Sequence, residues 1–397
     1  MQNRFDKTCQ HNYKIKILRN INELESIKNL WEEMISFCWH PHIDLDLYIA
    51  TLTTRDEILR PHIIILFRNE KPTTLVIGRI EDIPLEIKFG YKTLLKPLVR
   101  SLTIVYGGIV GDTSYQCCKI IISRLMQSLS QHEADVVLFN HLKLDSDIYH
   151  FAKVKPNFFC RDTFHISNTH WSLALPPSYN EFLHTLSKNT RKNIRNYSNR
   201  LKRDFGQNLI IKHISSVEEI DTILSDNEEI AKKTYKRGMG VGFHINNEIR
   251  KWYEIGLKRS ILNVYILYVN GQPVAFRKAF CFTDVFISYG TDYDPFYSNY
   301  RIGNFLLNYV IEDLYKKGTI KTIDFGFGDA DYKRIYCNEN WIESPVYIFA
   351  PTVKGIVINL MRGCTMHVSS IAQNILKKLN LYSKVKKRWR DQLRKNK

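Results

Sequence analysis

The sequence lacks the features that mark several common classes of protein. None of its eight cysteines forms a Cys-x-x-Cys pair, and a chain of 397 residues does not need disulfides to hold a small core. It has no apolar run of about 18 residues, the length that spans a membrane, and residues 1–15 have no apolar core of signal-peptide length. We therefore expect reduced thiols and a cytoplasmic location.

Familiar catalytic motifs are absent as well. The chain has neither the Gly-x-Ser-x-Gly elbow of hydrolases nor a Walker A loop. His40 and His42 flank a proline, but no further ligands are spaced to complete a zinc site, so we expect no metal. What is present is an apolar content of 44%, which suits a folded protein long enough for two domains.

The net charge of +17 comes mainly from two segments. Residues 184–206 carry seven lysines and arginines against one acidic residue, and residues 377–397 carry ten against one. Because the remainder is nearly neutral, the chain is not a uniformly basic nucleic-acid coat. The basic tail is interpreted in three ways: a solvated end, a contact to an anionic membrane at its inner face, or a contact to tRNA.

One order of elements occurs twice, about 190–200 residues apart. Each half is predicted to contain a strand, a capped helix, a hairpin with an Asn-x-x-Pro turn, a third strand, a helix and a last strand. Because hairpins are mixed with helices, the pattern predicts an α+β fold and not a doubly wound parallel sheet. The segments are 14–18, 20–34, 62–78, 102–107, 116–129 and 134–139, then 209–214, 216–224, 264–280, 285–290, 302–317 and 320–325.

A basic amphipathic helix is predicted between the halves. Apolar residues from Leu183 to Phe205 form one unbroken stripe at helical spacing, and most of the cations lie off that stripe. The basic face is either a solvated surface or an anion-binding surface beside an active cleft. The expected division is a first unit over 1–165, a linking strand and helix over 166–206, a second unit over 207–350 and a basic helical tail over 351–397.

Three motifs carry a resemblance to a known family. They are Ser187-Lys-Asn-Thr-Arg-Lys-Asn-Ile-Arg195, Gly271-Gln-Pro-Val-Ala275 and Ile323-Asp-Phe-Gly-Phe-Gly-Asp-Ala-Asp-Tyr-Lys333. With the order of elements, they resemble the GNAT acyltransferase fold in its duplicated, FemAB-like and CelD-like form, over roughly residues 12–350. The resemblance implies two tandem GNAT-like units, each a mixed, largely antiparallel sheet flanked by helices.

The resemblance also implies a reaction and its co-substrate. An acyl group, with acetyl as the first expectation, would pass from acyl-coenzyme A to an amine or hydroxyl of a small molecule or a cell-envelope precursor. GNAT proteins hold the coenzyme's pyrophosphate on backbone N–H groups at a helix start. The matching residues here are Arg301, Gly303 and Asn304, in a motif one residue shorter than usual. The first unit's counterpart, residues 111–116, has no basic residue, so that unit is expected to serve structure or acceptor binding.

Acyl transfer needs a proton acceptor, a proton donor for the leaving group and hydrogen bonds for the developing oxyanion. Asp324 and Asp329 lie at the end of the last strand and its Gly-rich exit, followed by Tyr332; Asp329 is the first candidate for the base. Tyr289 is a candidate proton donor or cleft wall. The alternatives are that the aspartates form turns and caps, and that Tyr289 is a core residue.

Several basic residues are candidates for substrate binding. Neighbours on a strand point to opposite faces, so either Arg277 or Lys278 must point into a core or a cleft. Arg237 precedes a Gly-rich loop at the position where the family engages its acceptor. The full set of substrate-binding candidates is Lys188, Arg191, Arg195, Arg237, Arg277 and Lys333.

Three functions therefore stay open. The first is an acyl-coenzyme A-dependent transferase. The second is an aminoacyl-tRNA-dependent transferase of the FemX kind, which the two basic segments favour. The third is a non-catalytic membrane- or RNA-binding protein, which the shortened pyrophosphate motif suggests.

Overall fold

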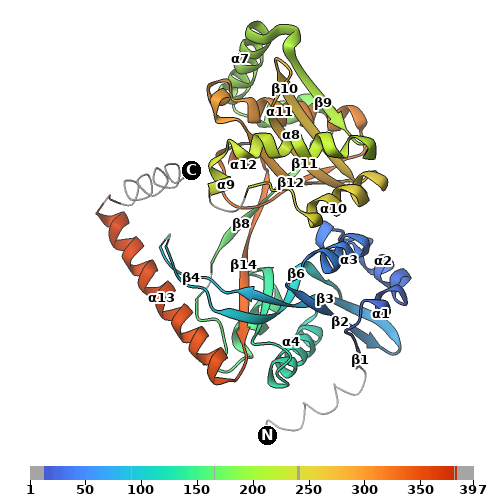
Figure 1. Ribbon diagram of the computed structural model, residues 1–397, viewed down its shortest axis with the longest axis vertical. Helices are drawn as coiled ribbons and strands as arrows, with labels where there is room; N and C mark the ends of the chain where they lie inside the picture. Colours follow the sequence, from blue (N-terminus) through green and yellow to red (C-terminus); the bar gives the residue numbers. More distant parts are fainter. Residues whose placement is uncertain (1–12, 91, 165, 239–241, 380, 382–397) are drawn as a thin grey trace. The chain divides into compact units, whose positions relative to one another are not determined.

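The computed structural model describes residues 13–90, 92–164, 166–238, 242–379 and 381 (Figure 1). The chain forms two compact units. Within the described residues, the first unit contains the chain up to Ser167 together with 342–379 and 381, and the second contains Asn168–Trp341. No helix among these residues is both long and apolar enough to cross a membrane.

The first unit is built on a six-stranded sheet in the order β1-β2-β3-β6-β7-β14. All neighbours are antiparallel except β6 and β7, which are parallel. Its elements are β1 (Tyr13–Leu18), α1 (Asn22–Glu25), α2 (Lys28–Ile35), η2 (Pro41–Ile43), α3 (Leu45–Thr54), β2 (Ile58–Arg68), β3 (Lys71–Pro84), β4 (Ile87–Phe89), β5 (Lys92–Leu95), β6 (Leu98–Gly111), α4 (Tyr115–Ser130), β7 (Val136–Lys143), α5 (Asp147–Val154), β14 (Glu339–Phe349) and α13 (Val353–Lys378).

The second unit repeats this plan with the order β9-β10-β11-β12-β13-β8. Here β12 and β13 are the parallel pair, and the other neighbours are antiparallel. Its elements are β8 (Asn168–Ala174), α6 (Tyr179–Thr185), α7 (Lys188–Phe205), η3 (Gly206–Asn208), β9 (Leu209–Ile214), η4 (Val217–Glu219), α8 (Ile220–Lys232), α9 (Tyr235–Gly238), α10 (Asn247–Lys258), β10 (Leu262–Val269), β11 (Gln272–Phe282), β12 (Val285–Tyr293), η5 (Pro295–Tyr300), α11 (Ile302–Lys317), β13 (Thr322–Phe327) and α12 (Asp331–Tyr336).

The predicted α+β fold and the duplicated plan are confirmed, but the last strand of each sheet comes from an unexpected part of the chain. β8, which follows the first unit in sequence, pairs with β13. β14, which follows the second unit, pairs with β7 between Glu343 and Phe349. The expected second unit of 207–350 is therefore wrong at its end, because residues 342–350 complete the first unit's sheet. Helix α13, expected as part of a separate tail, also belongs to that unit as far as it is described.

The sheet of the second unit is covered on both faces, and β11 shows how the faces divide. Ala275 and Ala279 pack in a buried cluster with α11, whereas Phe276 and Phe280 contact aromatic rings of the α10 side. Because side chains alternate along a strand, Arg277 shares the α11 face and Lys278 shares the α10 face. Both are buried, with relative exposures of 2% and 5%. The expectation that at least one of this pair points inward is confirmed.

The predicted unbroken helix from Leu183 to Phe205 is wrong, because the chain forms two helices. Leu186 is extended, with φ −78° and ψ 146°, and ends α6. Ser187 then starts α7 by accepting a hydrogen bond from the backbone N–H of Thr190. A side-chain cap satisfies a helix-start N–H that has no partner inside the helix, so the Ser-x-x-Thr segment favours a new helix over continuation of the old one.

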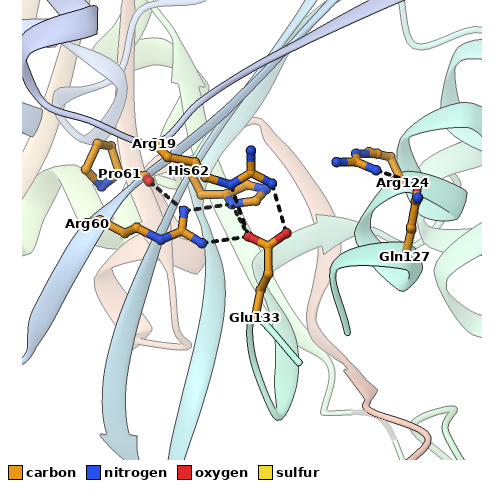
Figure 2. A network of polar contacts seen from close by, with 7 residues as sticks. All are labelled: Arg19, Arg60, Pro61, His62, Arg124, Gln127 and Glu133. Atoms are coloured by element: carbon orange, nitrogen blue, oxygen red, sulfur yellow. Dashed lines mark hydrogen bonds and ion pairs between the residues drawn. The ribbon is translucent and has the colours of Figure 1, made fainter. Parts of the chain in front are cut away.

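A partly buried ionic cluster links three segments of the first unit (Figure 2). The Glu133 carboxylate receives hydrogen bonds from Arg19 at 2.9 and 3.2 Å and from Arg60 at 2.6 Å. His62, fully buried on β2, lies beside them, with its Nδ1 3.3 Å from Nη1 of Arg60. Burial opposes ionisation of Glu133, yet the two guanidinium groups lower the pKa of this carboxyl to about 2. Burial lowers the pKa of His62 to about 4.

This cluster predicts a loss of stability in acid. His62 stays neutral in the folded chain below its ordinary pKa of 6.5, while the unfolded chain takes up a proton there. Stability should therefore fall as the pH drops from 6.5 towards 4, by up to about 1.4 kcal/mol per pH unit from this one residue. Glu133 adds a further loss below its ordinary pKa of 4.5. The free energy of unfolding, measured in urea at a series of pH values, should depend less steeply on pH in His62→Gln than in the unaltered protein. An unchanged dependence on pH would contradict the assignment.

Candidate functional site

Strands β12 and β13 part in the middle of the second unit's sheet. Their parallel pairing covers Val285–Ile287 and Thr322–Asp324 and ends there. On its other side, β12 stays paired with β11, but the register shifts at Tyr289: Ser288 pairs with Ala279 and Gly290 with Lys278. A bulge beside the end of a parallel pair leaves strand edges whose N–H and C=O groups the neighbouring strand does not use.

Helix α11 follows β12 and begins without a side-chain cap. Its N-cap residue, Arg301, has left-handed backbone angles, φ 55° and ψ 38°, which are uncommon for a residue with a side chain. A helix of 16 residues with free N–H groups at its start is favourable for a negative charge. A Cβ on Gly303, in the first turn, would lie 3.2 Å from the Tyr293 ring, so glycine lets that ring pack against the helix start.

A cavity of about 1180 Å³ opens at this helix start, and we call it the α11 cavity. Residues from α7, from the β12–α11 connection and from α12 with its preceding turn form its walls. They are Thr190, Asn193, Ile194, Asn196, Tyr197, Arg200, Tyr293, Asn299, Arg301, Asn304, Asp329, Ala330, Asp331, Tyr332, Arg334, Ile335 and Tyr336.

The cavity brings together four of the residues that the sequence singled out: Arg301, Asn304, Asp329 and Tyr332. It also contains Arg200, which sequence reasoning passed over because it is one cation among many on α7. The guanidinium of Arg200 lies over the ring of Tyr300, 4.6 Å from its centre. Two arginines near an uncapped helix start make this wall suitable for a phosphate-bearing ligand.

Arg277 lies beside this cavity. Its Nη1 donates to Ser288 Oγ at 3.0 Å, and its Cζ lies 5.7 Å from the centre of the Tyr332 ring and 6.0 Å from that of Phe325. It makes no ion pair with any described residue, and its Nε has no hydrogen-bond partner among them. A buried cation without a carboxylate partner is unusual. Its position places a positive charge where the strands part and next to the Tyr332 ring.

The two catalytic aspartate candidates lie in different surroundings. Asp324 Oδ1 lies 2.7 Å from Nε2 of buried His170 and accepts the backbone N–H of Gly326 at 2.6 Å. His170 is in turn stacked on Trp341, with ring centres 4.3 Å apart. Asp324 thus holds two segments together. Asp329 reaches the α11 cavity, but both of its oxygens contact the guanidinium of Arg334.

The glycines near these aspartates adopt left-handed backbone angles. Gly326 and Gly328 have φ of 65° and 96°, and a Cβ on either would meet open space. The turn therefore needs glycine for its backbone conformation. Lys333, a substrate candidate, closes this turn by donating to the carbonyls of Gly326 and Phe327 at 3.1 and 3.0 Å. Burial lowers the pKa of Lys333 to about 8.

Two further substrate candidates are used inside the fold. Arg191 donates to the carbonyls of Leu183, at 3.2 Å, and of Leu186, at 2.6 Å, at the end of α6. Arg237 pairs with Glu228 at 2.6 Å and donates to the Phe243 carbonyl at 2.8 Å. These contacts give both guanidinium groups structural roles.

The other candidates lie outside the α11 cavity. Lys188 and Arg195 are exposed on α7 and make no ion pair with a described residue. Tyr289 packs against Trp252 and Phe280, on the α10 side, and lines a second cavity. The predicted catalytic set is therefore not a single cluster in the structure.

The equivalent helix start in the first unit carries its own negative charge. Asp112 accepts the backbone N–H of Ser114 at 2.8 Å and contacts Cys117 Sγ at 3.2 Å, at the start of α4. The bond from Ser114 holds the pKa of Asp112 below its usual value. A carboxylate already at a helix start disfavours a second anion there. Among the described residues of either unit, no group of three His, Cys, Asp or Glu side chains is arranged to hold a metal.

The part of the chain that forms this site is similar to a known domain family. Residues 188–334, from the start of α7 into α12, match the acetyltransferase (GNAT) domain family. No curated protein is similar enough in sequence to be matched. The matched segment contains the separation of β12 from β13, the start of α11 and all the residues of the α11 cavity except Ile335 and Tyr336.

Several solved structures are similar to most of this chain, and two of them have a TM-score of 0.50. A conserved protein of unknown function from Bacteroides thetaiotaomicron is 14% identical and aligns over 84% of this chain and 100% of its own, with a TM-score of 0.50. A tandem GNAT protein from the clavulanic acid biosynthesis pathway is 8% identical over 85% of this chain and 99% of its own, also with a TM-score of 0.50. FemX is 9% identical over 74% and 89%, with a TM-score of 0.48. The chain has the tandem GNAT fold.

Proposed function

We propose, from the GNAT domain that residues 188–334 carry, that this protein transfers an acyl group from acyl-coenzyme A to an amine or hydroxyl. The observation that supports this most directly is the uncapped start of α11, with Arg301 and Arg200 in one cavity. The pyrophosphate of the coenzyme would lie on the free N–H groups of α11, where the helix dipole and both arginines favour it. Acetyl is the acyl group that we propose first.

The reacting end of the donor would lie where β12 and β13 part. An acyl oxygen there would accept hydrogen bonds from backbone N–H groups near the bulge in β12, which would stabilise the developing oxyanion. The acceptor's nitrogen or oxygen forms a bond to the acyl carbon and gives a proton to Asp329, the first candidate for the base, while the C–S bond breaks. Tyr332 would give its proton to the leaving sulfur, and the nearby charge of Arg277 would favour the tyrosinate that results.

A melting experiment tests the donor. Acetyl-coenzyme A, longer acyl-coenzymes A and bulk tRNA are each added, and the shift in Tm is measured. A ligand that binds only the folded state at 100 times its Kd should stabilise it by about 2.7 kcal/mol. We expect a clear rise with at least one thioester, and none with tRNA at 0.3 M salt, where phosphate contacts are weakened. No shift with any thioester would defeat this proposal.

One observation favours a second candidate, transfer from aminoacyl-tRNA. Helix α7 presents exposed cations beside the α11 cavity, and Lys188, Lys192, Arg195 and Lys202 make no ion pair with a described residue. A row of unpaired cations next to a phosphate site suits a donor longer than coenzyme A. A Tm rise with aminoacyl-tRNA at low salt, without one for any thioester, would favour this candidate. The proposed tRNA or membrane contact of the basic tail involves residues mostly outside those described.

A further inference from the structure

Lys278 is a buried cation that forms no ion pair within the described part of the protein. The nearby carboxylate of Asp292 offsets part of the effect of burial on the pKa of Lys278, but this carboxylate is paired with Lys236. The side chain of Lys278 comes from β11, on the face opposite Arg277, and its relative exposure is 5%. It makes neither a hydrogen bond nor an ion pair with any described residue, so none of these residues accepts a hydrogen bond from its ammonium group. An ammonium group buried in this way is costly unless something compensates it.

Aromatic rings provide part of that compensation. The Nζ of Lys278 lies 4.8 Å from the ring centre of Phe243, 5.2 Å from that of Tyr253 and 5.6 Å from that of Tyr289. The faces of such rings attract a cation, but they offer no acceptor for its N–H groups. Burial lowers the pKa of Lys278 to about 8, so most of the side chain is still charged at neutral pH.

The backbone is also adapted to this lysine. A Cβ on Gly290 would lie 2.6 Å from Cε of Lys278 and 3.4 Å from its Cγ. Glycine at this position of β12 therefore leaves the space through which the stem of Lys278 passes. A side chain at position 290 would have to displace that stem, so the conformation of Lys278 depends on glycine in the neighbouring strand.

A cavity of about 430 Å³ lies at the end of this path, and we call it the Lys278 cavity. It is lined by Lys236, Gly242, Phe243, His244, Asn246, Ile249, Phe276, Lys278, Tyr289, Gly290, Thr291 and Asp292. Its one carboxylate is already used, because Asp292 pairs with Lys236 at 2.7 Å. Lys278 is thus a buried charge in this cavity that has no ion pair with any described residue.

We propose that the Lys278 cavity binds the acceptor, and that the acceptor carries a carboxylate that pairs with Lys278. This inference rests on the acyl transfer proposed above. An ion pair with charge-assisted hydrogen bonds would satisfy the free donors of Lys278, which the rings cannot do. Phe243, Phe276, Ile249 and Tyr289 offer an apolar surface for the remainder of a small molecule, and the volume suits one.

The position of the cavity agrees with this role. Its wall runs along β12 from Tyr289 to Asp292, and Tyr293, the next residue, lines the α11 cavity. Tyr289 is also the bulged residue where the strands part. An acceptor held by its carboxylate at Lys278 would therefore have its amine or hydroxyl beside the proposed position of the acyl carbon.

The test uses two small probes of the same shape, phenylacetate and phenylacetamide, which differ only in charge. The full-length protein is labelled with ¹³C-lysine, and the Cε signal of Lys278 is identified by its loss in Lys278→Met. We expect phenylacetate to shift this signal saturably, to raise the pKa of Lys278 by at least one unit, and to bind at least tenfold more tightly than phenylacetamide. Equal binding of the two probes, no binding of either, or an unchanged pKa at saturating phenylacetate would overturn the proposal.

Two variants separate recognition from folding. Lys278→Met keeps the stem and removes the charge, so it should abolish the preference for phenylacetate without lowering Tm, since methionine suits a ring-lined pocket. Gly290→Ala keeps the charge and displaces the stem, and should weaken phenylacetate binding about tenfold. A preference that survives in Lys278→Met would overturn the proposal. Coenzyme A binding, measured by calorimetry in the unaltered protein and in both variants, tests the acyl donor separately. If none of the three proteins binds coenzyme A, the proposed function is defeated, whereas the preference for phenylacetate still tests the Lys278 cavity.

Discussion

The double variant Arg200→Asn/Arg301→Asn should bind coenzyme A about 100-fold more weakly than the unaltered protein. Both guanidinium groups line the α11 cavity at the start of a helix that has no side-chain cap. A hydrogen bond to a charged group contributes about 1.5–3 kcal/mol, and about 2.8 kcal/mol corresponds to 100-fold in Kd. Asparagine suits position 301 because it tolerates the left-handed backbone found there. Titration calorimetry measures the change.

Two further variants make the result specific. Arg250→Asn removes an exposed arginine whose ion pair with Asp221 lies outside both cavities, and it should leave Kd unchanged. Arg301→Lys keeps the positive charge but loses the forked geometry of the guanidinium group. Its Kd for coenzyme A should lie between those of Arg250→Asn and the double variant. If the double variant binds coenzyme A as tightly as Arg250→Asn does, the phosphates lie elsewhere and the α11 cavity is not the donor site.

The second large effect is expected for Tyr332→Phe, which should lower kcat about 100-fold or more while coenzyme A binding stays within threefold. The substitution removes one hydroxyl and leaves the ring that lines the α11 cavity. General acid catalysis by a positioned group contributes roughly 10²–10⁴-fold to a rate. Arg277, whose Cζ lies 5.7 Å from the centre of this ring, would support the charge that forms on the tyrosine. Release of free thiol from acetyl-coenzyme A, with an acceptor that the unaltered protein uses, provides the assay.

Two matched variants assign the proton transfers. Tyr289→Phe removes the hydroxyl of the other candidate donor, whose ring lines the Lys278 cavity, and should cost less than tenfold in kcat. Asp329→Asn tests the first candidate for the base, whose contacts with Arg334 leave it partly engaged. A loss of turnover in Tyr289→Phe with normal turnover in Tyr332→Phe would assign the proton donor to Tyr289 instead of Tyr332. Normal turnover in Asp329→Asn would exclude Asp329 as the base.

The sequence predicted local elements well because their signals are local. The hairpin turns, the capped helix starts and the alternation along β11 all depend on residues a few positions apart, and each half shows the same order. The predicted helix across residues 183–205 was wrong where two local signals competed. The apolar stripe continued through Leu186, but the cap at Ser187 and the contacts of Arg191 with the carbonyls at the end of α6 ended one helix and began another.

Partners that are distant in the chain could not be predicted in the same way. His170 and Asp324 are 154 positions apart, and neither carries a local motif that points to the other. The exchange of β8 and β14 between the two sheets has the same cause, since strand pairing joins segments whose separation in sequence no turn specifies. Arg200 is a further case, because only the packing of α7 beside the start of α11 distinguishes it from its neighbours.

The sequence by itself determined the duplicated α+β plan, the concentration of charge in two segments and the choice of Arg301, Asn304 and Tyr332 as candidates. The plan and the charge follow from composition and periodicity, whereas the candidates follow from short motifs and the resemblance to GNAT acyltransferases. The tertiary structure decided which candidates share a cavity, which are used inside the fold, and that Lys278 is buried without an ion pair to any described residue while Asp292 pairs with Lys236. The reason is physical: whether a charged side chain binds a ligand or stabilises the fold depends on which groups from other elements surround it.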